Sequence, residues 1–97
     1  MTEIKEIKKG DFWFHLDSGE FLDEKTGNDL LIKTRSIMHE KHTITIDLNK
    51  IRIINSKGYN YLIKLMHEAN SKQTSIYFTN VHPDIDELIT SLTFTSD

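Results

Sequence analysis

HTITIDLNKIRIINSKG, residues 42–58, is the stretch that decides the fold, because it joins a strand pattern to a helix start. Isoleucine and leucine alternate with polar residues over residues 42–48, which predicts a strand with one buried face. The stretch ends in Asn, Ser, Lys and Gly, and Asn and Ser are favoured as helix N-caps. A helix over residues 57–70 is therefore expected next. Its apolar face comprises Tyr59, Leu62, Ile63 and Met66.

Two strands and a helix are predicted before this stretch. Alternation of apolar and polar residues over residues 11–16 indicates a strand with one buried face. Residues 3–8 are expected to pair with it as a short edge strand after a turn at Lys9-Gly10. A helix then follows and ends before Lys41-His42. Its inner face comprises Leu30, Leu31, Thr34, Ile37 and Met38.

A strand over residues 74–79 and a last helix complete the pattern. Pro83 suits the first turn of that helix, because the proline ring fixes a helical φ angle. The face of this helix that is expected to point inward comprises Ile85, Leu88, Ile89 and Leu92. Strands that alternate with helices predict an α/β fold, a mixed, mostly parallel sheet of four or five strands with helices packed against it.

The composition fits one globular domain over residues 1–97, with 37% hydrophobic and 28% charged residues. A net charge of −3 argues against a general nucleic-acid binder, so we expect no direct contact with nucleic acid. No apolar run approaches the roughly 20 residues of a membrane-spanning helix. Residues 1–10 lack the apolar core of a secretory signal. We therefore expect a cytoplasmic protein without membrane insertion.

Sequence motifs of enzymes are absent. There is no phosphate-binding Gly-rich loop, no G-x-S-x-G and no H-E-x-x-H. The chain has no cysteine and its five histidines are scattered, so we expect no metal site and no cofactor. The densest acidic group is Glu20, Asp23 and Glu24, which solvated loop charges explain, with Asp23 as a helix N-cap. An enzyme is therefore the least favoured class.

Three motifs carry a resemblance to a known family. The apolar strand end before Asn55-Ser56-Lys57-Gly58 resembles the segment of STAS domains that leads into Asp-Ser-(Ser/Thr/Ala)-Gly at a helix start. Gly19-Glu20-Phe21-Leu22-Asp23 is similar to the family's Gly-Glu-Leu-Asp turn with one residue inserted. Residues 83–89 resemble the closing helix, which in the family leads to Gly-Leu, here Ser91-Leu92. The resemblance implies a single STAS-like domain over almost the entire chain.

The resemblance also implies a function. STAS domains occur in bacterial anti-sigma factor antagonists, where the Ser after the motif Asp is phosphorylated by a GHKL-type serine kinase that is also the anti-sigma factor. A PP2C-type phosphatase reverses the reaction, and the unphosphorylated form binds the anti-sigma factor. That position is Ser56 here. A non-catalytic, partner-switching antagonist controlled by reversible phosphorylation at Ser56 is therefore implied. The implied partner-binding residues are Asp23, Asn55, Ser56, Lys57, Gly58 and Asn60.

The motif also departs from the family pattern. Asn55 replaces the family Asp, Lys57 replaces a small residue, and Tyr59 replaces the usual Leu. Asn keeps the hydrogen-bonding shape of Asp without its charge, so helix capping should persist. A structural alternative stays open, in which Ser56 only caps the helix and Gly58 only allows close packing. The functional alternative is a cytoplasmic STAS subunit of an ABC-type lipid transporter, docked on an ATPase.

Charge is unevenly distributed along the chain. Residues 41–72 hold six basic side chains against two acidic ones, and Ser56 lies within this basic segment. Such a segment could favour an acidic partner surface, although solvated faces of a strand and a helix are the simpler explanation. The first strand, at the edge of the sheet, can pair with a copy of itself, so we expect a monomer or a weak homodimer.

Overall fold

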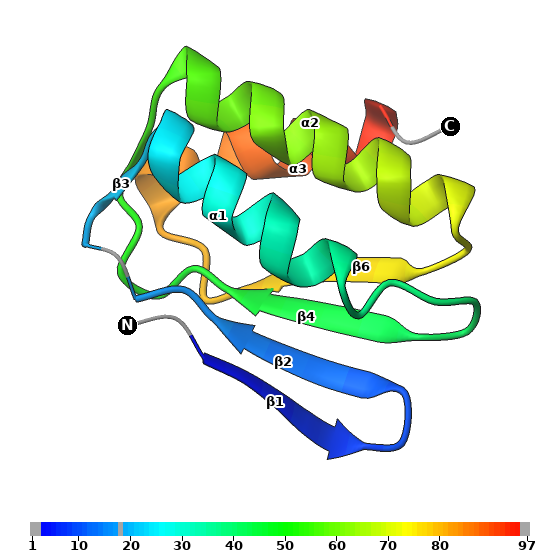
Figure 1. Ribbon diagram of the computed structural model, residues 1–97. Helices are drawn as coiled ribbons and strands as arrows, with labels where there is room; N and C mark the ends of the chain where they lie inside the picture. The colour runs from blue at the N-terminus through cyan, green and yellow to red at the C-terminus, as the bar shows by residue number, and fades with distance from the viewer. Residues whose placement is uncertain (1–2, 18, 96–97) are drawn as a thin grey trace.

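Residues 3–17 and 19–95 are described by the structure, a computed structural model in which four strands form one sheet in the order β1-β2-β4-β6 (Figure 1). β2, β4 and β6 run parallel, and β1 pairs antiparallel with β2 at one edge. The predicted α/β fold with a mixed, mostly parallel sheet is confirmed. The elements are β1 (Glu3–Lys8), β2 (Asp11–His15), β3 (Phe21–Leu22), α1 (Glu24–Arg35), β4 (Thr43–Asp47), β5 (Ile53–Ile54), α2 (Ser56–Ser71), β6 (Ser75–Thr79), a 3₁₀ turn (Pro83–Ile85) and α3 (Asp86–Thr95).

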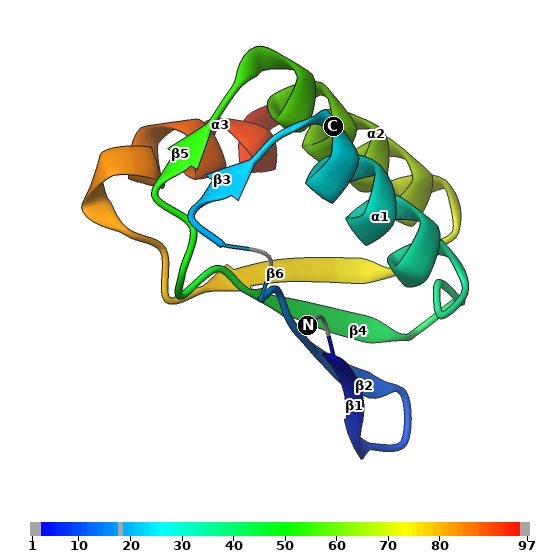
Figure 2. The ribbon, with the colours of Figure 1, turned by 60° about the vertical axis from the view of Figure 1, so that its left-hand side comes forward.

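The core lies between the inner face of this sheet and the helices. Ile44 and Ile46 of β4 are fully buried, and Phe14 of β2 is buried beside Ile46 in the strand register. Figures 1 and 2 show α1 and α2 on the same side of the sheet, with α3 alongside α2. α1 and α2 belong to the crossover connections that join β2 to β4 and β4 to β6. The predicted strand alternation therefore gives the apolar layer on which the helices pack.

The first strand pairs with the second as predicted. Gly10 occupies the turn with φ +80°, a conformation that glycine adopts without steric cost. The pairing register shifts between Glu6 and Lys8, which marks a bulge. Charged side chains and a bulge both make an edge strand a poor template for another chain, so this edge disfavours pairing with a second copy.

Two predictions about helix faces need correction. α1 ends at Arg35, so Ile37 and Met38 lie beyond the helix, although Met38 is still buried. Leu88 was expected to face the core, yet 38% of it is exposed. A 3₁₀ turn precedes α3, and its tighter winding changes the angle between successive side chains. Ile85 therefore remains buried while Leu88 turns toward solvent.

A buried carboxylate lies at the C-terminal end of β4. Asp47 is only 7% exposed, although its strand position predicted a polar outer face. Its Oδ1 accepts hydrogen bonds from the N–H of Asn49 at 3.0 Å and from Asn80 Nδ2 at 3.1 Å, and its Oδ2 lies 3.3 Å from His15 Nδ1. Burial by itself raises the pKa of Asp47, but these three hydrogen bonds outweigh burial and lower it below the usual value. The charged form is therefore favoured at this end of the sheet.

A second, smaller sheet, formed by β3 and β5, was not predicted from the sequence. These strands of two residues each pair in parallel, with Phe21 beside Ile53 and Leu22 beside Ile54 (Figure 2). Two residues are too few to show a period of two, so alternation could not reveal them. Because α1 begins directly after β3 and α2 directly after β5, the small sheet holds the N-terminal ends of both helices together.

Candidate functional site

The candidate site is the pair of neighbouring helix starts, defined as Asp23–Glu24 of α1 and Asn55–Lys57 of α2. We refer to it as the paired helix starts. Each start follows a strand of the small sheet and begins with an extended capping residue, Asp23 or Asn55. In each case the cap side chain accepts a hydrogen bond from a backbone N–H three residues later, which satisfies one of the helix's unpaired donors.

Asn55 is the N-cap of α2, so helix capping persists with an uncharged residue, as the sequence predicted. Asn55 Oδ1 accepts a hydrogen bond from the N–H of Gly58 at 2.8 Å. The N–H of Asn55 in turn donates to the carbonyl oxygen of Leu22 at 3.3 Å, which ties the cap to β3. The cap of this helix is therefore Asn55, and Ser56 is its first helical residue.

Gly58 is buried at the point where α2 crosses β3. A Cβ atom at Gly58 would overlap the carbonyl oxygen of Leu22, which is backbone and cannot turn aside. This contact explains why glycine is required three residues after the cap. Close packing is thus one role of Gly58, and the residue shapes the site from below because its own surface is covered.

Ser56 is exposed at the start of α2. Among the residues that the structure describes, no side-chain hydrogen bond engages its hydroxyl, whereas the neighbouring Asn55 side chain is occupied as the cap. Asn60 is also exposed and follows Ser56 by four positions, so both lie on the same face of α2. Ser56 and Asn60 therefore offer adjacent polar groups to solvent.

Lys57 and Glu24 connect the two helix starts through an ion pair, and Asp23 adds a second carboxylate on the α1 side. Lys57 Nζ lies 3.8 Å from Glu24 Oε2, and both side chains are largely exposed, so this ion pair contributes little to stability. Asp23 Oδ1 accepts a hydrogen bond from the N–H of Thr26 at 3.0 Å. That hydrogen bond lowers the pKa of Asp23 below its usual value. At neutral pH the site thus carries two carboxylates on the α1 side and one ammonium group on the α2 side.

The helices differ in the charges at their N-termini. The first turn of α1 contains Glu24 behind the charged cap Asp23, and the first turn of α3 contains Asp86 and Glu87. The first turn of α2 contains no acidic residue. Acidic groups at a helix N-terminus stabilise the positive end of the helix dipole. The N-terminus of α2 is therefore the one, among the three described helices, that still lacks a negative group.

Tyr59 of α2 and Ser91 of α3 are joined by a hydrogen bond between their side chains. Tyr59 Oη lies 2.5 Å from Ser91 Oγ, and Ser91 Oγ donates to the carbonyl oxygen of Leu88 at 2.6 Å. Tyr59 and Ser91 are two positions at which the sequence departs from the family motifs that it resembles. Their hydrogen bond fastens the first turn of α2 to α3.

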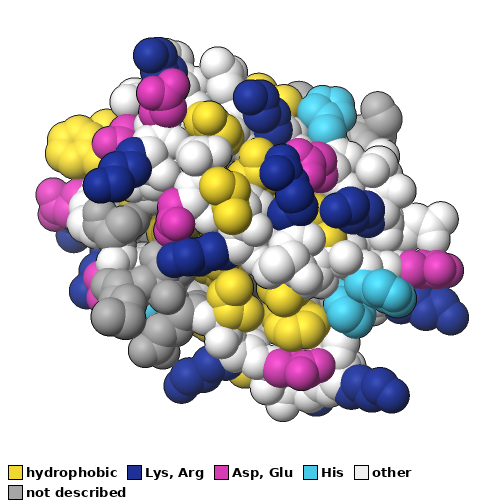
Figure 3. Space-filling view, viewed as in Figure 1, with side chains coloured by type: hydrophobic (Ala, Val, Ile, Leu, Met, Phe, Trp, Pro, Cys, Tyr) yellow, Lys and Arg dark blue, Asp and Glu magenta, His cyan; other side chains and the backbone are white. Residues whose placement is uncertain are grey.

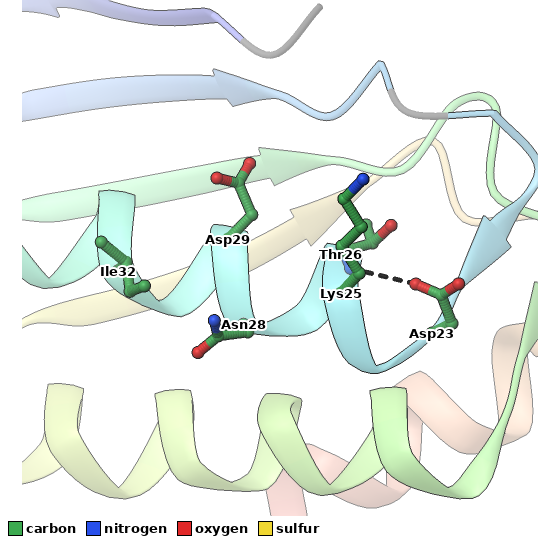
Figure 4. A pocket seen from close by; sticks show the side chains of 6 residues that line it. All are labelled: Asp23, Lys25, Thr26, Asn28, Asp29 and Ile32. Carbon is green, nitrogen blue, oxygen red and sulfur yellow. Dashed lines mark hydrogen bonds between the residues drawn. The ribbon is translucent and has the colours of Figure 1, made fainter.

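A groove of about 550 Å³ runs along α1 from Asp23 to Ile32 (Figure 4). Its lining mixes charged and neutral polar side chains, and Lys33 bridges to Asp29 at 3.1 Å near its far end. Figure 3 shows basic and acidic side chains interspersed over the face that carries α1 and α2, with apolar side chains between them. This groove has no buried polar group that would define a small-molecule site. The lining residues are Asp23, Lys25, Thr26, Asn28, Asp29 and Ile32.

Residues 3–17 and 19–95 contain no group of three or more His, Asp or Glu side chains placed to hold a metal ion. Within that same part of the chain, no helix combines the length and the apolar character that crossing a membrane requires.

Of the six residues that the resemblance implied for partner binding, the structure places Asp23, Asn55, Ser56 and Lys57 on the paired helix starts. Asn60 is exposed one turn further along α2, and Gly58 is buried beneath the site. The structure adds Glu24 through its ion pair with Lys57, and it adds the exposed pair Phe21 and Ile53 on the small sheet. Sequence reasoning missed this pair because an apolar residue in a short segment predicts burial. The small-sheet register, which pairs two distant segments, carries no local sequence signal.

Comparisons with known proteins agree with this architecture. The sequence profile described as the STAS domain matches residues 5–96. A search of curated proteins finds no match to the chain. Among solved structures, the crystal structure of Mglu matches with a TM-score of 0.70 and 9% sequence identity, covering 84% of this chain. The chain spans 20% of the length of Mglu, and at this identity the likeness shows the fold alone.

Proposed function

Since this chain belongs to the STAS domain family, we propose that it is a non-catalytic regulatory binding protein, an anti-sigma factor antagonist whose partner binding is switched by reversible phosphorylation at Ser56. The observation that carries the proposal is the exposed Ser56 at the start of α2, the helix whose first turn lacks an acidic residue. STAS domains mediate contacts between proteins, and the proposed place of these contacts is the cytoplasm.

A phosphate on Ser56 is compatible with the fold. It would add about −1.5 to −2 charges near neutral pH. The backbone N–H groups and the dipole at a helix N-terminus favour such a charge. Lys57 is the adjacent cation, and its exposed ion pair with Glu24 is long enough to be exchanged for the phosphate. The helix would therefore tolerate the modification while the charge of the surface changes.

The proposed partners are a GHKL-type serine kinase that is also the anti-sigma factor and a PP2C-type phosphatase. Ser56 shares the paired helix starts with Asp23, Asn55 and Lys57. Asn60 lies on the same face of α2 one turn further on, and the buried Gly58 packs against Leu22 beneath the site. A partner that contacts this surface would meet the Ser56 hydroxyl at close range. Phosphorylation would then place a negative group inside the contact and weaken binding by charge repulsion and desolvation.

The direct test is intact-mass measurement after incubation with ATP and a candidate GHKL-type kinase from the same organism. We expect a single phosphate on the chain, its loss in Ser56→Ala, and its retention in Ser71→Ala. Ser71 is a matched control because it is also exposed and lies at the opposite end of α2. A phosphate found only at another residue would contradict the assignment.

A binding measurement tests the switch itself. We expect Ser56→Ala to bind the kinase and Ser56→Asp to bind it about tenfold or more weakly, which corresponds to about 1.4 kcal/mol. Equal affinities of the two variants would contradict partner switching at this residue. Copurification with an ATPase and a membrane permease in place of a kinase would instead support the transporter-subunit alternative.

A further inference from the structure

Phe21 and Ile53 form an exposed apolar pair on the small sheet. They are direct neighbours in the parallel register of β3 and β5, and they are 54% and 47% exposed. Their successors Leu22 and Ile54 point to the other side, where Leu22 is fully buried and Ile54 packs against the core. Phe21 and Ile53 therefore point to solvent because successive side chains of a strand point to opposite faces.

This apolar pair is continuous with the paired helix starts. In an extended chain, residues two apart point to the same side. Asp23 follows Phe21 by two residues and Asn55 follows Ile53 by two, and both caps have extended backbone angles. Ser56 comes directly after Asn55. Phe21, Ile53, the two caps and Ser56 thus lie along one end of the molecule, where Figure 2 shows β3 and β5 leading into α1 and α2.

The charges beside this pair are unequal on its two sides. On the β5 side, Arg52 precedes Ile53 and Lys57 follows Ser56, and residues 48–67 contain no acidic residue. On the β3 side, Glu20 Oε1 lies 3.7 Å from Arg52 Nε and Glu24 Oε2 lies 3.8 Å from Lys57 Nζ, and Asp23 adds a third carboxylate. These ion pairs are exposed, so their cations can exchange partners at little cost. When these pairs open, the β5 side offers Arg52 and Lys57 to the carboxylates of a partner, whereas the β3 side remains acidic.

We propose that Phe21 and Ile53 are the apolar anchor of the partner-binding surface, and that they insert into an apolar pocket of a protein whose rim carries Asp and Glu side chains facing Arg52, Lys57 and the N-terminus of α2. Binding energy at interfaces concentrates in a few apolar or aromatic residues surrounded by a polar rim. This inference rests on the proposed function, because it extends the surface around Ser56. A phosphate on Ser56 would lie between the anchor and the acidic rim, and its negative charge would repel the carboxylates of the rim.

Site-specific photo-cross-linking in cells of the source organism tests the anchor. A benzoylphenylalanine is placed, one position at a time, at Phe21, Ile53, Ile7 or Tyr77 in the full chain. Ile7 and Tyr77 are matched controls, because they are 60% and 58% exposed and lie on β1 and β6. We expect one and the same partner peptide at Phe21 and Ile53, rich in apolar and acidic residues, and no such peptide at the two controls.

Several outcomes would overturn the anchor. The first is that no adduct forms at Phe21 and Ile53. The second is that the same adduct forms at Ile7 or Tyr77. The third is that the charged residues of the cross-linked peptide are basic. Circular dichroism of each variant establishes that it is folded. As a second measurement without a bulky side chain, Phe21→Ser and Ile53→Ser should each weaken binding to the cross-linked partner about tenfold or more, and Ile7→Ser should not.

The same experiment separates this inference from the proposed switch. Introducing Ser56→Asp into the cross-linking chain should reduce the adduct at Phe21 and Ile53 about tenfold. If the adduct persists unchanged at both positions and is absent from the controls, the anchor stands and the switch at Ser56 is wrong. If phosphorylation at Ser56 is found but no adduct forms at Phe21 or Ile53, the switch stands and the anchor is wrong.

Discussion

Two strand–cap–helix units lie side by side in this molecule, β3 with Asp23 and α1, and β5 with Asn55 and α2. Both caps accept a hydrogen bond from the N–H three residues later, at 3.0 Å in α1 and 2.8 Å in α2. Both helices also carry a buried glycine close to the cap, Gly27 and Gly58. The two units differ in charge, because α1 begins with two carboxylates and α2 with none.

This difference shows which features of a helix start are constrained and which are free. Geometry is constrained by the small sheet and by the close contacts of the glycines. The charge of the cap is free to vary, because Asp and Asn offer the same acceptor oxygen to the backbone. A regulatory charge can therefore be added at Ser56, where α2 has none, while the α1 start is already charged.

The largest expected effect comes from the glycines. Gly58→Ala should lower the free energy of unfolding by about 3 kcal/mol or more, since the added Cβ would overlap the backbone carbonyl of Leu22. Gly27→Ala should cost about 1–3 kcal/mol, because its Cβ would lie 2.7 Å from the Cβ of Tyr61 on α2, where the two helices can separate slightly. Urea-induced unfolding of both variants measures the difference. A larger loss in Gly27→Ala would show that the helix contact is the stiffer one.

Particular residues show how far the sequence could predict this arrangement. The alternation around Ile44 and Ile46 was enough for β4, and the cap role of Asp23 followed from its residue type before a helix. The pairing of Phe21 with Ile53 could not be predicted, because it joins segments about thirty residues apart through strands of two residues. The hydrogen bond between Tyr59 and Ser91 was equally hidden, since each residue only looked like a separate departure from the family pattern.

The next effect in size comes from the neutral cap. Asn55→Ala should lower the free energy of unfolding by about 1 kcal/mol, because the N–H of Gly58 loses its acceptor. Asn60→Ala is the matched control, an exposed Asn of the same helix without a capping role, and should change stability by less than about 0.5 kcal/mol. Asn55→Asp should retain the wild-type stability or exceed it. Equal losses in the two alanine variants would mean that the cap hydrogen bond contributes nothing.

A smaller effect tests the missing charge of α2. Ser56→Asp should raise the free energy of unfolding by about 0.3–1 kcal/mol at low salt, through the helix dipole and Lys57. Ser71→Asp, at the C-terminal end of the same helix, should lower it by a similar amount. Both changes should shrink at about 1 M salt, where the screening length falls to about 3 Å. If Ser56→Asp destabilises the fold, the N-terminus of α2 does not favour a negative group, and the proposed tolerance of a phosphate at Ser56 is wrong.

The smallest expected difference is in the response to acid. The hydrogen bond from Thr26 lowers the pKa of Asp23 below 3.8, so the charged cap stabilises the fold above that pH. This contribution is lost as the pH falls through the lowered pKa, because the folded state must then bind the proton. Asn55 does not titrate, so the α2 cap keeps its strength. The stability difference between the wild type and Asp23→Asn should therefore change between neutral pH and pH values below 3.8, in the direction that favours the variant in acid.

In the reciprocal variant Asn55→Asp, the same acid sensitivity should appear at α2, and thermal unfolding across this pH range measures both. An acid response that is the same in the wild type and both variants would show that the caps differ in sequence but not in electrostatic effect.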